Sequence, residues 1–210
     1  DKGIVRKMTD VLRHRGPDDE GYYFWEGDGI QVGFGHRRLS IIDLVTGHQP
    51  MSNEDGTIWI TYNGEVYNFP EIRRQLLKRH EFKSNTDTEV LLHLYEEEGE
   101  GFLDRLNGMF GLGLVDLREK KLMLVRDRLG IKPLYYAFYD GNLVFASEIK
   151  AILETGLIPR EIDWQAIWDY FTYLFIPHPQ TAFKHIRQLP PAHLALFDLS
   201  TGELELRSYW

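Results

Sequence analysis

The chain has 210 residues, no cysteine and a formal net charge of −8. The absence of cysteine excludes disulfides, thiolate metal sites and a cysteine nucleophile within these residues. The acidic balance argues against nucleic acid or an anionic membrane as a partner, because no basic excess is available to pair with phosphates. An apolar share of 43% with 12 Phe and 11 Tyr indicates a packed globular domain.

The chain shows neither an apolar run of membrane-spanning length nor the apolar centre of a signal peptide at its N-terminus. We therefore expect a cytoplasmic enzyme or binding domain. The abrupt end at "RSYW" is typical of a domain cut from a longer protein.

The first 70 residues predict one helix followed by strands. Ile4, Met8, Val11 and Leu12 share one helical face in residues 2–14, and Gly16-Pro17 stops that helix. The expected strands cover residues 21–25, 30–42 and 57–62. Their connections are too short for crossover helices, which predicts that these strands pair in antiparallel fashion.

The rest of the chain predicts helices and three hairpins. The expected helices cover residues 70–80, 86–106, 148–154 and 164–173, and Thr86 and Glu89 have capping-box spacing in the second of them. The expected hairpins lie within residues 109–127, 133–147 and 193–210, and Asp140-Gly141 forms the centre of the second. This order predicts an α+β fold with two layers of antiparallel strands and helices outside.

Asn63-Gly64 has two competing interpretations. The pair is a strong signal for a tight hairpin turn, here a short one because Pro70 ends the returning strand. A side-chain amide next to a free glycine amide is also a suitable pair of donors for an oxyanion hole. Without the rest of the chain, the turn is the favoured interpretation.

Arg38 and Asp87 are candidate ligands for the two charged ends of a free amino acid. Arg38 ends a strand, where its planar donor fork could bind a carboxylate at two points or simply be solvated. Asp87 lies in the first turn of a helix, where it could bind an ammonium group or simply complement the helix dipole.

Other motifs predict structure rather than chemistry. The segment at residues 13–21 contains ordinary turn residues, and Arg126, Asp127 and Arg128 could pair with one another. The eight histidines lack paired helical spacing such as H-E-x-x-H, so we expect no metal site.

Eight motifs together resemble the glutaminase domain of the asparagine synthetases, which are class II glutamine amidotransferases of the N-terminal-nucleophile hydrolase superfamily. The motifs are "LRHRGPDDEG", "GHRRLSIIDL", "GHQPM", "YNGEVYN", "NTDTEVLLHLYEEEG", "LNGMFGLGLVD", "RDRLGIKPLYY" and "FASEIKAIL". They follow one another in order from about residue 8 onward. The resemblance implies a four-layer αββα sandwich of two antiparallel sheets.

The resemblance also implies an activity and a set of site residues. The family releases ammonia from glutamine through a glutamyl thioester and passes it to a synthetase domain in cis, which activates aspartate with ATP and Mg²⁺. This domain itself needs no cofactor. By motif, glutamine binding falls on Arg38, Leu39, Ser40, Ile41, Ile42, Glu65 and Asp87, and the oxyanion hole falls on Asn63 and Gly64.

The family's nucleophile is an N-terminal cysteine on an apolar first strand, and this chain has neither. We therefore expect residues 1–210 to be an amidotransferase domain without its first strand and its synthetase domain, inactive as it stands and prone to form a homodimer through unpaired sheet edges. Two alternatives are a non-hydrolytic, structural domain like that of the β-lactam synthetases and an amino-acid-binding module.

Overall fold

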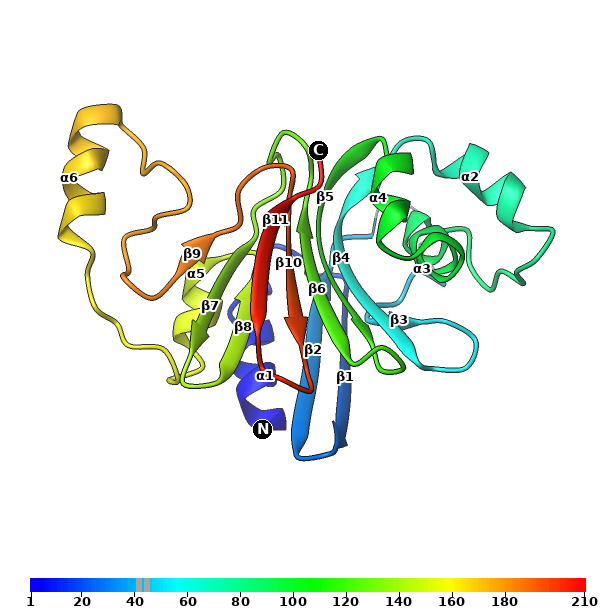
Figure 1. Ribbon diagram of the computed structural model, residues 1–210, viewed down its shortest axis with the longest axis horizontal. Helices are drawn as coiled ribbons and strands as arrows, with labels where there is room; N and C mark the ends of the chain where they lie inside the picture. Colours follow the sequence, from blue (N-terminus) through cyan, green and yellow to red (C-terminus); the bar gives the residue numbers. More distant parts are fainter. Residues whose placement is uncertain (41–42, 44–45) are drawn as a thin grey trace.

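The computed structural model describes residues 1–40, 43 and 46–210, and it shows a four-layer α+β sandwich (Figure 1). The helices are α1 (Lys2–Asp10), α2 (Phe69–Leu76), α3 (Asp87–Glu98), the 3₁₀ turn η1 (Gly99–Gly101), α4 (Phe102–Arg105), α5 (Ile149–Leu153) and α6 (Trp164–Tyr173). The strands are β1 (Asp19–Gly27), β2 (Ile30–Arg38), β3 (Met51–Ser52), β4 (Ile58–Val66), β5 (Gly108–Asp116), β6 (Lys121–Arg126), β7 (Tyr135–Tyr139), β8 (Asn142–Ala146), β9 (Arg187–Gln188), β10 (His193–Asp198) and β11 (Leu204–Ser208).

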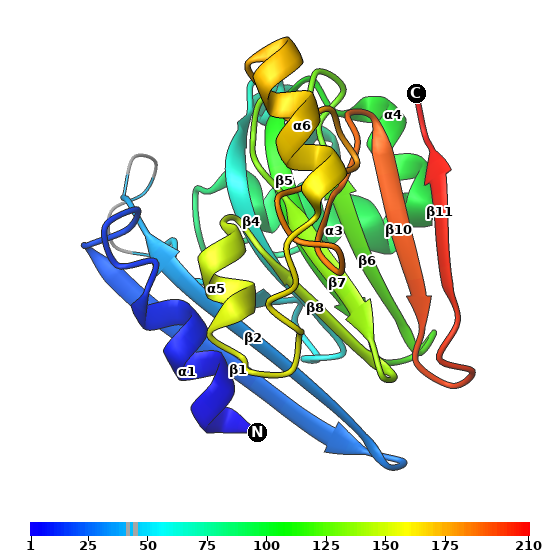
Figure 2. The same cartoon turned by 90° about the vertical axis from the view of Figure 1, so that its left-hand side faces the viewer.

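One strand layer is a six-stranded antiparallel sheet in the order β11-β10-β6-β5-β4-β3. The opposite layer consists of two smaller sheets, β1-β2 and β8-β7-β9. Helices α2, α3 and α4 cover the outer face of the six-stranded sheet, and α1 and α5 lie side by side over the smaller sheets (Figures 1 and 2). The predicted sandwich is therefore confirmed.

Three hydrophobic clusters fill the three spaces between the layers. The first lies between the six-stranded sheet and α2–α4, the second between the two strand layers, and the third between β7–β8 and the pair α1 and α5. Alternate residues of β4 illustrate the division, because Ile58 and Ile60 belong to the first cluster and Trp59 packs against the second.

Glycines on β2 bring α1 into contact with the sheet. A Cβ on Gly35 would lie 2.1 Å from the hydroxyl of Thr9, and one on Gly33 would lie 2.8 Å from a methyl group of Val5. The "GFG" stretch thus admits the helix at a distance that larger residues would forbid.

The three hairpins predicted in the second half of the chain are confirmed as β5–β6, β7–β8 and β10–β11. At the β7–β8 turn, Asp140 and Gly141 have φ values of 48° and 72°, as a two-residue hairpin turn requires.

Two other predictions were wrong in part. The helix expected over residues 86–106 breaks at Gly99, whose φ is +55°. The three early strands do not form one set, because β1 pairs with β2 whereas β4 pairs with β3 and β5 in the opposite layer. Short loops therefore indicated antiparallel strands correctly but not which sheet each strand joins.

The "RDRLGIKP" segment forms a buried polar hub rather than the mutual ion pairs considered above. The carboxylate of Asp127 is fully buried and accepts hydrogen bonds from four backbone N–H groups, those of Phe110, Leu129, Ile131 and Lys132, at 2.9–3.1 Å. Arg126 donates to the carbonyl groups of Gly130, Lys132 and Leu189. Both side chains therefore stabilise the surrounding loops by forming hydrogen bonds with backbone groups of those loops.

Helix α6 projects from the sandwich and leaves large side chains in solvent (Figure 1). Trp164, Trp168 and Phe171 are 73%, 71% and 75% exposed. No helix in the described ranges is long and apolar enough to cross a membrane.

Replacing Asp127 with Asn should lower the free energy of unfolding by about 3 kcal/mol, because the amide cannot accept all four buried N–H groups. Urea denaturation followed by circular dichroism measures this loss. The matched change Asp104→Asn at an exposed position should have almost no effect. A similarly small loss of stability at both positions would show that the hydrogen bonds to Asp127 do not stabilise the fold.

Candidate functional site

Two strands facing each other across the space between the sheets supply most of the candidate site. On β2, Val32 and Phe34 pack into the space between the sheets, so alternation places His36 and Arg38 on the same face. On β4, Thr61 lies on the face opposite the helices, and its hydroxyl is 3.0 Å from Nδ1 of His36.

Asn63 and Gly64 lie in the middle of β4 and do not form a turn. They pair with Gly111 and Phe110 of β5, so the hairpin interpretation was wrong. A Cβ on Gly64 would lie 2.3 Å from the carbonyl oxygen of Met109, which shows that glycine here allows β5 to approach closely.

Asn63 follows Thr61 on the face toward the space between the sheets and lines a cavity there. Its Nδ2 atom is buried and has no hydrogen-bond partner among the described residues. A buried donor without a partner costs about 1–3 kcal/mol, so such groups are rare unless a ligand satisfies them.

Asp87 is positioned by the start of α3. The hydroxyl of Thr86 caps the helix by accepting from the N–H of Glu89 at 3.3 Å. The predicted reciprocal bond is absent, because the Glu89 carboxylate accepts instead from the N–H groups of Lys83 and Ser84. Only the Thr86 half of the capping box therefore forms, whereas the side chain of Glu89 binds the backbone of the preceding loop.

Asp87 is buried, and the protein satisfies one of its carboxylate oxygens. Its Oδ2 accepts from the Tyr62 hydroxyl at 2.8 Å and from the N–H of Val66 at 3.0 Å, and Asp87 lines the cavity. Burial, and next the charge of Asp87, raise the pKa of Tyr62 well above its usual value, so the phenol stays a donor to the carboxylate.

Arg38 is buried, with 8% of the residue exposed, and its guanidinium lies against Gly47. It donates to the carbonyl oxygen of Asp43 at 2.5 Å. A Cβ on Gly47 would lie 2.1 Å from Nη2 of Arg38, so a side chain there would displace the guanidinium. The same Cβ would lie 2.9 Å from the methyl group of Thr86, the residue before Asp87, so the guanidinium lies near the start of α3.

One cavity of about 1120 Å³ brings most of the predicted site residues together. The predicted residues that line it are Arg38, Leu39, Asn63, Gly64, Glu65 and Asp87. Ser40 does not line it, and its N–H instead donates to Asp18 at 2.8 Å. Ile41 and Ile42 lie outside the described residues. The roles of all these residues remain predictions.

Sequence reasoning missed two residues that shape this cavity. Gln49 is buried, and its side-chain amide donates to the carbonyl oxygen of Tyr62 at 3.1 Å and accepts from the N–H of Tyr62 at 2.7 Å. It thereby holds the residue before Asn63. His36 lines the cavity opposite β4. Gln49 lies in the "GHQPM" motif and His36 in the "GHRR" motif, but neither motif indicates which groups these two side chains contact.

The imidazole of His36 is held neutral. Burial, followed by the positive charge of Arg38, lowers the pKa of His36 from 6.5 to about 4. At neutral pH the ring therefore adds no positive charge beside Arg38.

The cavity also extends between β2 and β8. Each of these strands has one paired neighbour, β1 and β7 respectively, and both border the cavity along residues 32–35 and 142–146. Among the described residues, β2 and β8 thus each present one edge without a strand partner, and both edges border the same cavity.

Comparison with known proteins identifies the class. Residues 1–210 match the model of the glutamine amidotransferase domain, and the chain belongs to this family. Asparagine synthetase [glutamine-hydrolyzing] 2 of Bacillus subtilis is 43% identical over 99% of this chain and 28% of its own length. The putative asparagine synthetase [glutamine-hydrolyzing] 2 of Methanocaldococcus jannaschii is 37% identical over 100% of this chain and 44% of its own length.

The chain thus spans less than half the length of these relatives. Among solved structures, the glutamine phosphoribosylpyrophosphate amidotransferase of B. subtilis matches 99% of this chain and 46% of its own chain, with a TM-score of 0.71 and 18% identity. This match supports the fold, and the sequence relatives support the kinship with the glutamine-hydrolysing asparagine synthetases.

Stability should fall as the pH is lowered from about 6.5 to about 4, because unfolded His36 takes up a proton that the folded protein refuses. The shift in the pKa of His36 corresponds to at most about 3.5 kcal/mol at ~1.4 kcal/mol per pKa unit, and the partial exposure of the side chain reduces this contribution. Urea midpoints measured across this range check the expectation. His36→Gln should flatten the pH dependence, whereas His178→Gln at an exposed position should preserve it. Equal profiles for both variants would contradict the assignment.

Proposed function

We propose that this chain forms the glutamine-binding and oxyanion-stabilising part of a glutamine-dependent asparagine synthetase. The observation that carries the proposal is the buried, unpartnered Nδ2 of Asn63, which lines the same cavity as Arg38 and Asp87. A cation, an anion and a spare amide donor around one hollow suit a small zwitterion with a carbonyl group.

In this arrangement, Arg38 binds the α-carboxylate of glutamine and Asp87 binds its α-ammonium group. A guanidinium matches a carboxylate by two parallel hydrogen bonds, and a buried carboxylate compensates an ammonium charge. Tyr62 and Val66 orient Asp87 by donating to Oδ2. Leu39 and Glu65 also line the cavity. The proposed glutamine-binding residues include Ser40, Ile41 and Ile42, which follow Arg38 closely along the chain.

The reaction begins when a thiolate attacks the side-chain carbonyl carbon of glutamine. The carbonyl oxygen gains negative charge, which the Asn63 amide and the Gly64 N–H stabilise. Collapse of this intermediate breaks the C–N bond, the amine leaves as ammonia after taking a proton, and a thioester remains. Water then attacks the thioester, which releases glutamate and restores the thiol.

The nucleophile in this proposal comes from outside residues 1–210, because these contain no cysteine. We place this nucleophile on an extended segment between the unpaired edges of β2 and β8. Such a segment would form backbone hydrogen bonds with both strands and would join the two small sheets into one. Such a strand runs beside the cavity that Asn63 lines. Residues 1–210 alone should then bind glutamine without hydrolysing it, and dimerisation through these edges remains a prediction.

Ammonia is consumed, in this proposal, by a synthetase domain in the same protein that uses ATP and Mg²⁺ to amidate aspartate. The names of the relatives and their greater length support this second domain. The exposed aromatic residues of α6 offer a surface that such a domain would cover.

Replacing Asn63 with Ala in the full-length protein should lower kcat for glutamine hydrolysis by about 100-fold or more and change KM little, because the donor acts on the charged intermediate. Glutamate formation measures the rate. Synthesis from ammonium salts should be unchanged, and so should hydrolysis by the exposed variant Asn107→Ala. A kcat within threefold of the parent protein would remove Asn63 from the mechanism.

Replacing Asp87 with Asn should raise KM for glutamine by roughly 10- to 100-fold, because the amide still accepts from Tyr62 but no longer compensates the ammonium charge. Initial-rate kinetics and calorimetric titration with glutamine provide the measurements. The exposed variant Asp104→Asn is the matched control. An unchanged KM would place the ammonium site elsewhere.

A further inference from the structure

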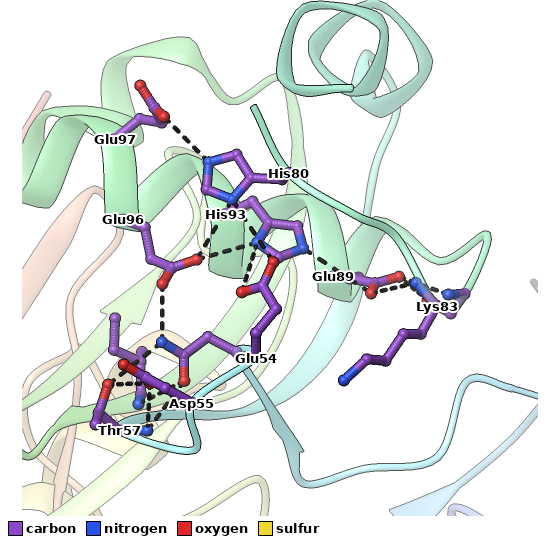
Figure 3. A network of polar contacts seen from close by, with 12 residues as sticks. Glu54, Asp55, Thr57, His80, Lys83, Glu89, His93, Glu96 and Glu97 are labelled. Carbon is purple, nitrogen blue, oxygen red and sulfur yellow. Dashed lines mark hydrogen bonds and ion pairs between the residues drawn. The ribbon is translucent and has the colours of Figure 1, made fainter. Parts of the chain in front are cut away.

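A second cluster of chemistry-bearing side chains lies away from the cavity, where α3 meets two loops (Figure 3). Glu54 belongs to the turn between β3 and β4, His80 follows α2, and His93 and Glu96 are three residues apart on α3. One ligand atom from each of the four residues can be chosen so that all lie within 4.8 Å of one another.

The two imidazole rings present the same nitrogen to the same pair of carboxylates. Nδ1 of His93 is 3.0 Å from Oε2 of Glu96 and 3.7 Å from Oε2 of Glu54. Nδ1 of His80 is 3.8 Å from Oε2 of Glu96 and 3.9 Å from Oε1 of Glu54. A tetrahedral ion with bonds of ~2.0–2.1 Å keeps its ligands about 3.3–3.4 Å apart, so these separations bracket a metal polyhedron.

The surroundings orient these four groups as the outer shell of a metal site does. Nε2 of His80 is 3.1 Å from the carboxylate of Glu97. Nε2 of the buried His93 has no hydrogen-bond partner and faces Oε1 of Glu89 at 3.9 Å. Each ring thus has a carboxylate near its Nε2 atom, and metal-bound histidines commonly donate their second ring N–H to such a carboxylate.

The Glu96 carboxylate is held in the same way. Asn53, which is buried, donates to its Oε1 at 2.8 Å and leaves Oε2 directed at the imidazoles. The side chain of Glu54 is 41% exposed, so the cluster is accessible from solvent on this side.

The two imidazole rings lie close together within a shell of carboxylates. His80 and His93 stack with their ring centroids 4.4 Å apart and their planes 28° from parallel. Four glutamates around the two rings supply more than enough negative charge for a divalent ion.

We propose that Glu54, His80, His93 and Glu96 bind one divalent transition-metal ion of the zinc type. Two imidazoles and two carboxylates suit Zn²⁺ and its neighbours in the first row, whereas Mg²⁺ and Ca²⁺ prefer oxygen ligands throughout. Spacing along the sequence predicted no metal site, because the ligands come from three separate segments.

The ion would cross-link α3 to the β3–β4 turn and to the segment after α2. His93 lies six residues after Asp87 on the same helix, about 9 Å along its axis at ~1.5 Å per residue. The metal would therefore stabilise the helix that carries Asp87 without entering the cavity. The inference stands independently of the proposed function.

The test uses the full-length protein, stripped with a chelator and titrated with Zn²⁺ and separately with Co²⁺. The parent protein should bind one equivalent that His80→Gln loses or binds at least about tenfold more weakly. Zn²⁺ should raise the thermal midpoint of the parent by a few degrees and that of His80→Gln by less, and Mg²⁺ should not reproduce the difference. Co²⁺ should give visible absorption bands that the variant lacks.

His185→Gln is the matched control, because it removes another histidine paired with a glutamate, Glu161, and it should bind the ion as the parent does. If His80→Gln does not fold, Glu54→Gln on the exposed turn serves the same purpose. Equal metal stoichiometry, affinity and Co²⁺ spectra in the parent and the cluster variant would overturn the proposal, as would the absence of binding by the parent.

Discussion

The facing of β2 and β4 across the space between the sheets is the constraint on which the site depends. Successive side chains of a strand point to opposite faces, so the residues that pack the central cluster fix the direction of the polar residues further along. Phe34 on β2 determines where His36 and Arg38 point, and Trp59 on β4 determines where Asn63 points. A slip of one residue in either strand would turn these groups toward the helices.

Buried polar side chains hold that register by binding the backbone. The side chain of Gln49 forms hydrogen bonds with the N–H and the carbonyl group of Tyr62, and the carboxylate of Glu89 accepts from a backbone N–H of the loop before α3. Asp127 does the same for the loop after β6. Among the described residues, buried side-chain nitrogens of Asn63, His93, Arg128 and Arg187 lack a hydrogen-bond partner, and of these four residues only Asn63 lines the cavity, where a ligand could accept from its amide.

Much of the fold could be predicted from the sequence, because hairpins and amphipathic segments are local patterns. The turn at Asp140-Gly141 needed only its own neighbours to form. Asn63-Gly64 carries the same kind of signal, yet nine residues of continuous pairing with β5 override it. A local preference of about 1 kcal/mol is small beside a whole strand in a central sheet, which explains the error.

The motifs named candidate site residues, whose roles remain predictions, but not the residues that support them. Arg38, Asn63 and Asp87 line one cavity as the motifs indicated. The roles of Gln49 and the cluster around His93 depend on which loops meet in space, and residue types along the chain do not contain that information. Sheet membership was missed for the same reason, since loop length does not decide which layer a strand joins.

The three separate hydrophobic clusters imply that the layers need not melt together. The cluster under α2–α4 is built on the six-stranded sheet, whereas β7 and β8 are only five residues long and β8 has no second strand partner among the described residues. Amide hydrogens of β4 and β5 should therefore exchange with solvent far more slowly than those of β7 and β8. On gentle heating, the wall formed by the small sheets would loosen first, so the cavity would lose its shape while most of the helical signal persists.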